Sequence, residues 1–287
     1  NGALFESAMC FGAAKLHAAV NEETPLRILG QMPEDIKTKR NLKMQRMFAL
    51  LTAAVFSDGP ADAEGPAAAK DYFNRGVAYA SKGDYDKAIA EFSQAIRLNP
   101  GYAGAYVNRG AAYNERGDFD KAIADHSQAI RLNADDAAAY YNRGNVYADK
   151  GDPDKAIEDY TQAIRLNADD AAAYYNRGNA YADKGDFGQA ITDYDQVIRL
   201  NPDYTTAYVN RGNAYDENGD HDKAIADYDQ AIRIDPDYAE AYFNRGLVYD
   251  EKGDYLRARA DYEKTLQIDA NNPWALQNLE VLRREGH

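Results

Sequence analysis

Cysteine is almost missing from this sequence, since Cys10 is the only one among 287 residues. A disulfide within the chain needs two cysteines and a thiolate metal site needs several, so both are excluded. Histidine is also scarce, and His17, His126, His221 and His287 are far apart along the chain. With no pair of metal-ligating residues at helical spacing, the sequence predicts neither a metal site nor a cofactor.

The sequence also has no long apolar run and little positive charge. No apolar stretch approaches the ~20 residues that cross a bilayer, so no transmembrane span is predicted. Residues 67–287 contain 39 acidic residues but only 26 lysines and arginines, and this part carries −13 of the net charge of −14. Because so acidic a surface repels a phosphate backbone, nucleic acid is not an expected partner.

The residue patterns of common enzymes are missing as well. There is no glycine-rich nucleotide fingerprint and no nucleophile with a matching base. The first 66 residues are too short to hold a catalytic domain of their own. The sequence therefore predicts a protein that is not an enzyme.

Repetition is what the sequence has in abundance. The stretch NADDAAAYYNRGN occurs at residues 133–145 and again, letter for letter, at 167–179. Weaker copies recur every 34 residues, so that six units follow one another without an insertion or deletion, at residues 69–102, 103–136, 137–170, 171–204, 205–238 and 239–272. A fixed period of this length is typical of a solenoid of helix–turn–helix repeats.

Each unit has the pattern of two antiparallel helices. In the third unit Tyr140, Gly144 and Tyr147 recur at helical spacing and define one face. Gly151 is suited to end that helix in a left-handed conformation, and Asp152 is suited to cap the next helix. A mid-helix glycine costs about 1 kcal/mol relative to alanine, so we interpret the recurring ones as close-packing residues: Gly76, Gly110, Gly144, Gly178, Gly212 and Gly246.

These features resemble the tetratricopeptide repeat, in the bacterial subclass with an NRGxAY core. The core reads YYNRGNVY at 140–147 and YFNRGLVY at 242–249, and the small and large positions of the motif match in all six units. His126 stands at a position that is otherwise aromatic, and we interpret it as a packing substitution; Thr265 stands where alanine or valine is usual. The resemblance implies an all-α fold, a right-handed superhelical solenoid.

Residues 273–287 follow the last unit and continue its phase. We expect one further helix there, because a solenoid needs a polar-faced end to stay soluble. In this capping helix Arg283, Arg284 and Glu285 are expected to face water. The residues expected to cover the last repeat are Trp274, Leu276, Leu279 and Leu282.

The family resemblance implies a concave groove, lined by the first helices, that binds an extended peptide. Each unit places an asparagine two residues before its glycine, and a ladder of carboxamides can donate to and accept from a peptide main chain. The alternative is that these asparagines bond to neighbouring helices and hold the stack together. The ladder consists of Asn74, Asn108, Asn142, Asn176, Asn210 and Asn244.

Two further rows of side chains flank this ladder and would set specificity. The first is aromatic and consists of Phe73, Tyr141, Tyr175 and Phe243. The second is acidic and consists of Glu115, Asp149, Asp183, Glu217 and Glu251. Chaperone-binding members of the family hold a C-terminal carboxylate with lysines and arginines, which this chain does not have at the matching positions. A neutral or basic extended segment is therefore the expected ligand; the alternative is a merely solvated acidic face.

A column of arginines follows the asparagine ladder, one residue further along each first helix. It invites a phosphate-binding interpretation, but each second helix carries a matching acid, and we interpret the two columns as ion pairs between helices that fix the register between units. The arginines are Arg75, Arg109, Arg143, Arg177, Arg211 and Arg245, and the acids are Glu91, Asp125, Asp159, Asp193, Asp227 and Asp261.

Residues 1–66 show no 34-residue phase. A basic run at 37–46, a ten-residue apolar stretch at 47–56 and small residues at Ala61 and Ala63 follow the order of a signal peptide cleaved before Glu64. Cleavage would make the protein periplasmic or secreted. The alternative is an amphipathic helix that caps the first repeat in an uncut, cytoplasmic protein. The stretch SDGPADAEGPAAA is expected to be a loose linker in either case.

The expected function is a non-enzymatic protein–protein interaction scaffold that binds a segment of a partner protein, with a bacterial cell envelope as its place of work. A second alternative is a structural unit that associates with itself through the ends or faces of the solenoid into a homo-oligomer. A third is an intracellular peptide-sensing regulator. It would need a DNA-binding head, and the acidic body and the unstructured-looking start of the sequence argue against it.

Overall fold

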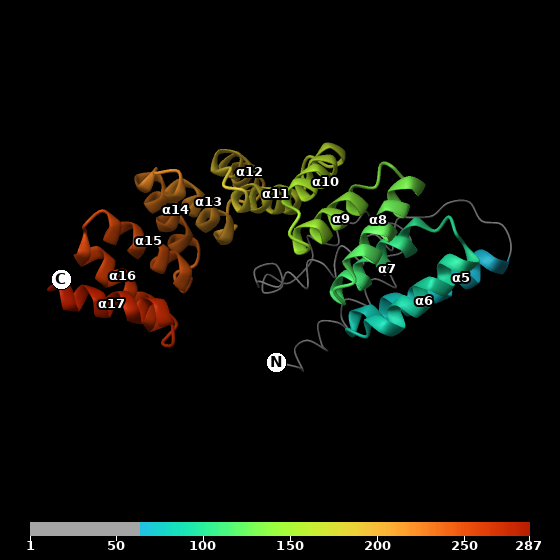
Figure 1. Cartoon of the computed structure of the whole chain (residues 1–287), viewed down its shortest axis with the longest axis horizontal. Helices are drawn as coiled ribbons and strands as arrows, with labels where there is room; N and C mark the ends of the chain where they lie inside the picture. The colour runs from blue at the N-terminus through green and yellow to red at the C-terminus, as the bar shows by residue number, and fades with distance from the viewer. Residues whose placement is uncertain (1–63) are drawn as a thin grey trace. The chain divides into compact units, whose positions relative to one another are not determined.

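The computed structural model describes residues 64–287, which form thirteen α-helices and contain no strand (Figure 1). The first helices of repeats 1 to 6 are α5 (Glu64–Ser81), α7 (Ala103–Glu115), α9 (Ala137–Asp149), α11 (Ala171–Asp183), α13 (Thr205–Glu217) and α15 (Ala239–Glu251). The second helices are α6 (Tyr85–Leu98), α8 (Phe119–Leu132), α10 (Pro153–Leu166), α12 (Phe187–Leu200), α14 (His221–Ile234) and α16 (Tyr255–Ile268), and α17 (Pro273–Glu285) follows them. This confirms the predicted all-α solenoid of helix–turn–helix repeats.

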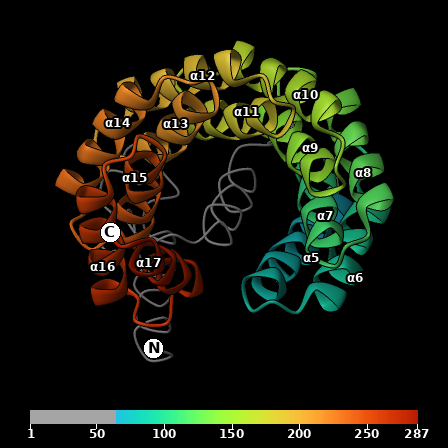
Figure 2. The same cartoon turned by 60° about the vertical axis from the view of Figure 1, so that its left-hand side comes forward.

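Each helix packs mainly against the helices before and after it in the sequence, and the first helices of adjacent repeats also touch. Within residues 64–287 this gives a curved row in which the first helices lie on the inner side and the second helices on the outer side (Figure 2). We call the side formed by the first helices the inner face. No helix among these residues is both long and apolar enough to cross a membrane.

The turn between the two helices of a repeat is built as the sequence predicts. Gly151 adopts a φ of +81°, the left-handed conformation that closes a helix without steric strain in a residue that has no Cβ. The backbone N–H of Asp152 then donates to the carbonyl of Tyr147 at 2.9 Å. The Asp152 side chain accepts from the backbone N–H of Lys155 and caps α10. Pro153 is the first residue of that helix, where its missing N–H has no consequence.

The mid-helix glycines let the two helices of each repeat approach closely, as predicted. A Cβ atom added to Gly144 would lie 2.8 Å from Cε1 of Tyr160, whose ring is 1% exposed. The same approach recurs in every repeat, from 2.5 Å between Gly76 and Phe92 to 2.9 Å between Gly110 and His126. Real Cβ atoms essentially never come this close to a neighbour. These glycines are therefore packing residues.

The N-terminal end of the array differs from the prediction. Helix α5 begins at Glu64, so residues 64–69 of the expected linker are helical. Pro66 is compatible with this because it lies in the first turn, where the backbone N–H groups have no partner within the helix. The signal peptide and the alternative docking helix predicted for residues 37–63 lie outside the described residues.

Helix α17 covers the last repeat with fewer of its apolar residues than predicted. Leu279 and Leu282 are buried beside Tyr262, as expected. The prediction for Trp274 and Leu276 was wrong, since they are 63% and 51% exposed. The contact face passes through Ala275, and residues one position to either side of it are rotated by about 100° around the helix. The exposed side of α17 is therefore partly apolar.

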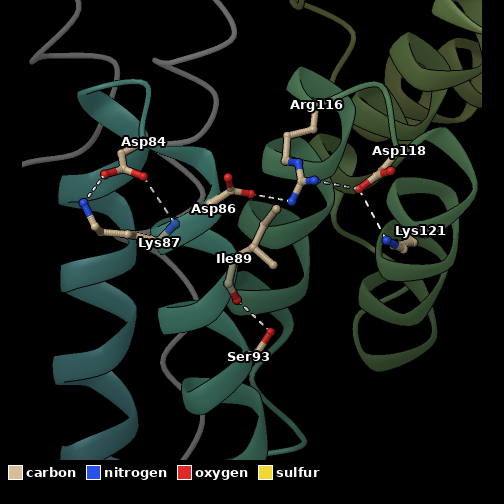
Figure 3. A network of polar contacts seen from close by, with 8 residues as sticks. All are labelled: Asp84, Asp86, Lys87, Ile89, Ser93, Arg116, Asp118 and Lys121. Atoms are coloured by element: carbon tan, nitrogen blue, oxygen red, sulfur yellow. Dashed lines mark hydrogen bonds and ion pairs between the residues drawn. The ribbon is translucent and has the colours of Figure 1, made fainter.

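Charged side chains also connect one repeat to the next on the surface. Between repeats 1 and 2, Arg116 lies 2.5 Å from Asp86 and also approaches Asp118, at 3.9 Å (Figure 3). The matching pairs along the array are Lys150 with Asp120, Lys184 with Asp154 and Lys252 with Asp222. Because these pairs are exposed, solvent screens them and each contributes little to stability.

Candidate partner-binding site on the inner face

The asparagine ladder is partly occupied by contacts between repeats. The side-chain nitrogen of Asn176 donates to the hydroxyl of Tyr141 at 3.0 Å and to Oδ1 of Asn145 at 2.9 Å, both in the preceding repeat. Oδ1 of Asn145 also accepts from the hydroxyl of Tyr160, at 2.8 Å. The ladder therefore holds neighbouring first helices together, which was the alternative interpretation of these residues.

The same network recurs along the second half of the array. Asn210 donates to Tyr175 and Asn179, and Asn244 donates to Asn213. The hydroxyls of Tyr194 and Tyr228 donate to Asn179 and Asn213. Asn145, Asn179 and Asn213 form a second asparagine column that was not predicted from the sequence. The signal was present, because these asparagines occur only where the second helix of the same repeat carries a tyrosine.

The asparagines of the ladder are buried in repeats 2 and 3. Asn108 is 1% exposed and donates to the carbonyl of Gly104 in its own helix, and Asn142 is 7% exposed. A partner cannot reach side chains this deeply buried, so these two members of the predicted ladder do not belong to an open groove. Asn74 is exposed, and Asn176, Asn210 and Asn244 are half-buried.

The ladder also has a member in the capping helix. Asn278 lies 34 residues after Asn244, and its side chain hydrogen-bonds to the Tyr262 hydroxyl. The predicted ladder contained only the asparagines of the six repeats, so Asn278 was missed. A further step of the period along the chain would have found this residue.

The aromatic row belongs more to the core than the sequence predicts. Phe73 is 1% exposed and packs on Phe92 and Tyr102, with ring centroids 5.7 and 4.9 Å apart, so its assignment to a binding surface was wrong. The other three are half-buried. Each packs on the aromatic ring of its own second helix at about the same distance: Tyr141 on Tyr160 at 5.9 Å, Tyr175 on Tyr194 at 6.0 Å and Phe243 on Tyr262 at 5.9 Å.

The acidic row lies at the C-terminal ends of the first helices. Glu115, Asp149, Asp183, Glu217 and Glu251 are the last residues of α7, α9, α11, α13 and α15. A negative charge there opposes the helix dipole and costs about 0.3–1 kcal/mol. Two of these acids have partners that offset the cost: Glu115 accepts from the hydroxyl of Tyr85 at 3.3 Å, and Asp149 accepts from Asn114 at 2.8 Å. Asp183 and Glu217 are exposed.

The arginine column forms the predicted ion pairs between helices. Nε and Nη2 of Arg109 donate to the two carboxylate oxygens of Asp125 at 2.7 and 2.8 Å, which is a bidentate pair within repeat 2. Its Nη1 donates to Ser93 of the preceding repeat at 3.0 Å, and this third contact is what connects the units. In repeat 3, hydrogen bonding to Asp159 raises the pKa of Arg143. The same bidentate pair recurs in repeats 3 to 6, so the arginines of repeats 2 to 6 do not form a phosphate site. In repeat 1, Arg75 donates only through Nε to Glu91, and its side chain is 50% exposed.

The interpretation of His126 as a packing substitution is confirmed. Its ring is completely buried against Gly110, and neither ring nitrogen has a hydrogen-bond partner among the described residues. Burial, together with the nearby charge of Arg143, lowers the pKa of His126 to about 3. The imidazole is therefore neutral at ordinary pH.

Comparisons with known proteins agree with this architecture. Models described as "TPR repeat" match residues 76–115, 112–151 and 212–253, and models described as "Tetratricopeptide repeat" match residues 141–205, 193–226 and 239–272. A search of curated proteins found no match.

Three solved structures with the same architecture align with this chain over nearly their entire length. The crystal structure of MamA is 33% identical over 56% of this chain and 94% of that one, with a TM-score of 0.54. YrrB, described as a TPR protein with an unusual peptide-binding site, is 25% identical over 66% of this chain and 97% of its own, with a TM-score of 0.58. PilF of Pseudomonas aeruginosa, at 14% identity over 75% of this chain and 98% of its own and a TM-score of 0.63, shares the fold. The repeats, their close-packed glycines and these matches show that the chain belongs to the tetratricopeptide repeat family.

Proposed function

We propose that this protein-interaction scaffold is not an enzyme and binds an extended, neutral or basic segment of a partner protein along its inner face. One observation carries the proposal: the first helices end in acids, although a negative charge at a helix C-terminus opposes the dipole. Asp183 and Glu217 are exposed, and no hydrogen bond within the described part of the chain explains their presence. Such a row favours a partner with positive charges at matching intervals.

The distribution of positive charge supports the same ligand class. Arg177, Arg211 and Arg245 are held by buried acids of their second helices, so they offer no clamp for a partner's carboxylate. Lysines at the ends of the first helices, such as Lys150 and Lys252, are paired with acids of the preceding repeat. The inner face therefore presents acids without a matching set of available cations.

The half-buried asparagines would contribute recognition of the peptide main chain. Their amide nitrogens are engaged between repeats at Asn176, Asn210 and Asn244. We therefore assign the role of peptide acceptor to the carboxamide oxygens, which would receive N–H groups of an extended segment. The description of YrrB as a TPR protein with an unusual peptide-binding site is consistent with a peptide ligand.

The test compares two pairs of charge-neutralising substitutions. The first is Asp183→Asn with Glu217→Gln at the ends of the first helices. The second is Asp169→Asn with Glu158→Gln, which are exposed in the turn after α10 and on α10 itself, outside the acidic row. Both pairs change the net charge by the same amount. Fluorescent ten-residue peptides of alternating serine and lysine are the probe, with serine–glutamate peptides as the reference.

We expect the wild type to bind the lysine peptide, with an affinity that falls as salt rises. The first pair should weaken binding about ten-fold or more, while the second pair should leave it nearly unchanged. Equal losses for both pairs would mean that only the overall charge matters, and no binding by the wild type would reject a basic ligand.

Self-association is the second candidate function, and the exposed apolar side of α17 favours it. Trp274, Leu276 and Val281 are 63%, 51% and 41% exposed at the end of the array, where a further element would stack. Light scattering over a concentration series separates the two functions. A binding module stays monomeric, whereas an assembly unit gains mass with concentration and loses that gain in the variant Trp274→Glu.

For the place of action we propose the cell envelope, reached by cleavage of a signal peptide at residues 37–63. The support is the order of basic, apolar and small residues in that segment. The intact mass of the protein from fractionated cells tests this. A chain that begins at Glu64 in the periplasmic or secreted fraction is the expected result, and an uncut cytoplasmic chain would favour the intracellular regulator instead.

A further inference from the structure

Three metal-ligating side chains meet at the junction of repeats 5 and 6. Asp216 lies in the last turn of α13, His221 is the first residue of α14 and Glu251 is the last residue of α15. One ligand atom from each lies within 4.8 Å of the others, and Nδ1 of His221 is 2.7 Å from Oδ1 of Asp216. It is the only group of this kind that the described part of the chain contains. The spacing along the sequence does not indicate such a site, because His221 lies 5 positions after Asp216 and 30 positions before Glu251.

The other repeats show which of these residues depart from the common pattern. The position of His221 holds Tyr85, Phe119, Pro153, Phe187 and Tyr255 in the other repeats. The position of Asp216 holds Ala80, Asn114, Ala148, Ala182 and Asp250. The position of Glu251 is acidic in each of repeats 2 to 6. Only at the junction of repeats 5 and 6 do an imidazole and two carboxylates coincide.

The matching junction between repeats 1 and 2 shows what the position can reach. There the hydroxyl of Tyr85 donates to the carboxylate of Glu115, the last residue of the next first helix. The first residue of a second helix is therefore directed toward the acid of the following repeat. At His221 that residue is an imidazole, which can bind a metal ion, and Asp216 adds a second carboxylate.

From this arrangement we infer that Asp216, His221 and Glu251 form a binding site for a divalent transition metal ion of the zinc class. One imidazole nitrogen and two carboxylate oxygens are a donor set that suits zinc better than magnesium or calcium, which prefer oxygen ligands alone. Two ligands of one zinc ion are at most about 4.2 Å apart, twice a zinc–oxygen distance. Glu251 is exposed, so rotation of its side chain can close the remaining gap.

The bound ion would connect α13, α14 and α15, and so fasten repeat 5 to repeat 6. His221 and Asp216 have side chains 30% and 28% exposed, so the site is open to solvent and water can complete the coordination. The site shares Glu251 with the acidic row proposed for the peptide, but His221 and Asp216 are not part of that row. Variants of these two residues therefore test the metal site separately from the peptide.

Zinc chloride titrated into the full chain without an affinity tag, and followed by calorimetry, tests the site. The variants are His221→Tyr and Asp216→Ala, which introduce residues that other repeats carry at the same positions and so preserve the fold. The controls are His287→Ala, which removes another exposed imidazole, and Cys10→Ser with His17→Ala, which removes the ligand candidates of the N-terminal segment.

We expect one zinc ion per chain in the wild type and in both controls. Each variant of the site should weaken zinc binding by at least about ten-fold, the loss that even an outer-shell partner causes. Thermal melting adds an independent readout, because zinc should raise the Tm of the wild type but not that of His221→Tyr. Undiminished zinc affinity in His221→Tyr, equal binding of magnesium, or no zinc binding by the wild type would each overturn the inference.

Discussion

A small hydrogen-bond network connects neighbouring repeats from repeat 3 onward, and repeat 2 lacks three of its members. Where repeat 3 has Tyr141, Asn145 and Tyr160, repeat 2 has Val107, Ala111 and His126. As a result the amide nitrogen of Asn142 and both ring nitrogens of His126 are buried without a hydrogen-bond partner among the described residues. An unsatisfied buried polar group costs about 1–3 kcal/mol. The junction of repeats 2 and 3 is therefore a weak point of the array at the residue scale.

Restoring two of the missing members should stabilise this junction, since repeat 5 forms the network with Asn213 and Tyr228 although it has Val209 at the third position. We predict that the double variant Ala111→Asn, His126→Tyr raises the free energy of unfolding by about 1–3 kcal/mol, because Asn142 and the new hydroxyl both gain an acceptor. Urea unfolding of the wild type, both single variants and the double variant forms a double-mutant cycle. His126→Tyr alone buries a hydroxyl without its acceptor, so it should be less stable than the double variant. If the effects of the two single substitutions on the free energy of unfolding simply add up in the double variant, the network does not form.

The buried histidine also makes stability depend on pH. Its pKa is about 3 in the folded protein, against about 6.5 when unfolded, so between these values the unfolded chain binds more protons. Stability is then lost as the pH falls below 6.5. Between pH 7 and pH 5 the wild type should lose about 2 kcal/mol more than His126→Phe, which has the residue of repeat 1 at this position. Urea unfolding of both proteins at the two pH values measures the difference, and parallel pH dependences would contradict it.

At the scale of the helix, close approach and helix propensity oppose each other at the repeated glycines. Gly144→Ala should gain about 1 kcal/mol in helix propensity. It should lose more, because its Cβ would meet Tyr160 at 2.8 Å and overpacking costs about 1–3 kcal/mol. The control is Gly188→Ala in α12, where the nearest atom is 3.9 Å away. We expect a lower Tm for the first variant and an unchanged or higher Tm for the second; a stabilised Gly144→Ala would show that Tyr160 can move aside.

The sequence predicted the helices well because each element is specified locally. The 34-residue period, the left-handed Gly151 and the capping Asp152 determine where helices begin and end. The arginine and acid columns could be paired because the arginine of each first helix meets the acid of its own second helix in all six repeats. Burial could not be predicted in this way, since Asn142 and Asn176 lie in the nearly identical stretches YYNRGNVY and YYNRGNAY. Asn142 is nevertheless buried, whereas Asn176 is half-buried and bonds to Asn145 of the preceding repeat.

The site on the inner face was predicted less well than the fold. The acidic row lies at the ends of the first helices, and its predicted role beside the asparagine ladder stays a prediction. Phe73 was assigned to the groove, although the second helix of its repeat and Tyr102 enclose its ring. The cluster at His221 was missed because it joins the ends of three helices. Its members meet only when the angle between successive repeats is known.

At the scale of the whole array, stability is a sum of repeats and of contacts between nearest neighbours. Helix α17 is the last neighbour, and it buries Leu279 and Leu282 against Tyr262 and Ala258 of repeat 6. Its effect should therefore be local. Leu282→Ala removes a side chain that is 1% exposed and should cost about 2–5 kcal/mol in the repeat it covers.

Hydrogen exchange followed by mass spectrometry can locate this effect along the chain. In Leu282→Ala the amides of α15, α16 and α17 should exchange faster, while those of α9 to α12 should keep their wild-type rates, because they belong to repeats 3 and 4, away from α17. Val281→Ala, next to it but 41% exposed, is the matched control and should leave all rates unchanged. Faster exchange along the entire array would instead show that the six repeats unfold as one cooperative unit, and a ligand that fastens one junction would then stabilise all of them.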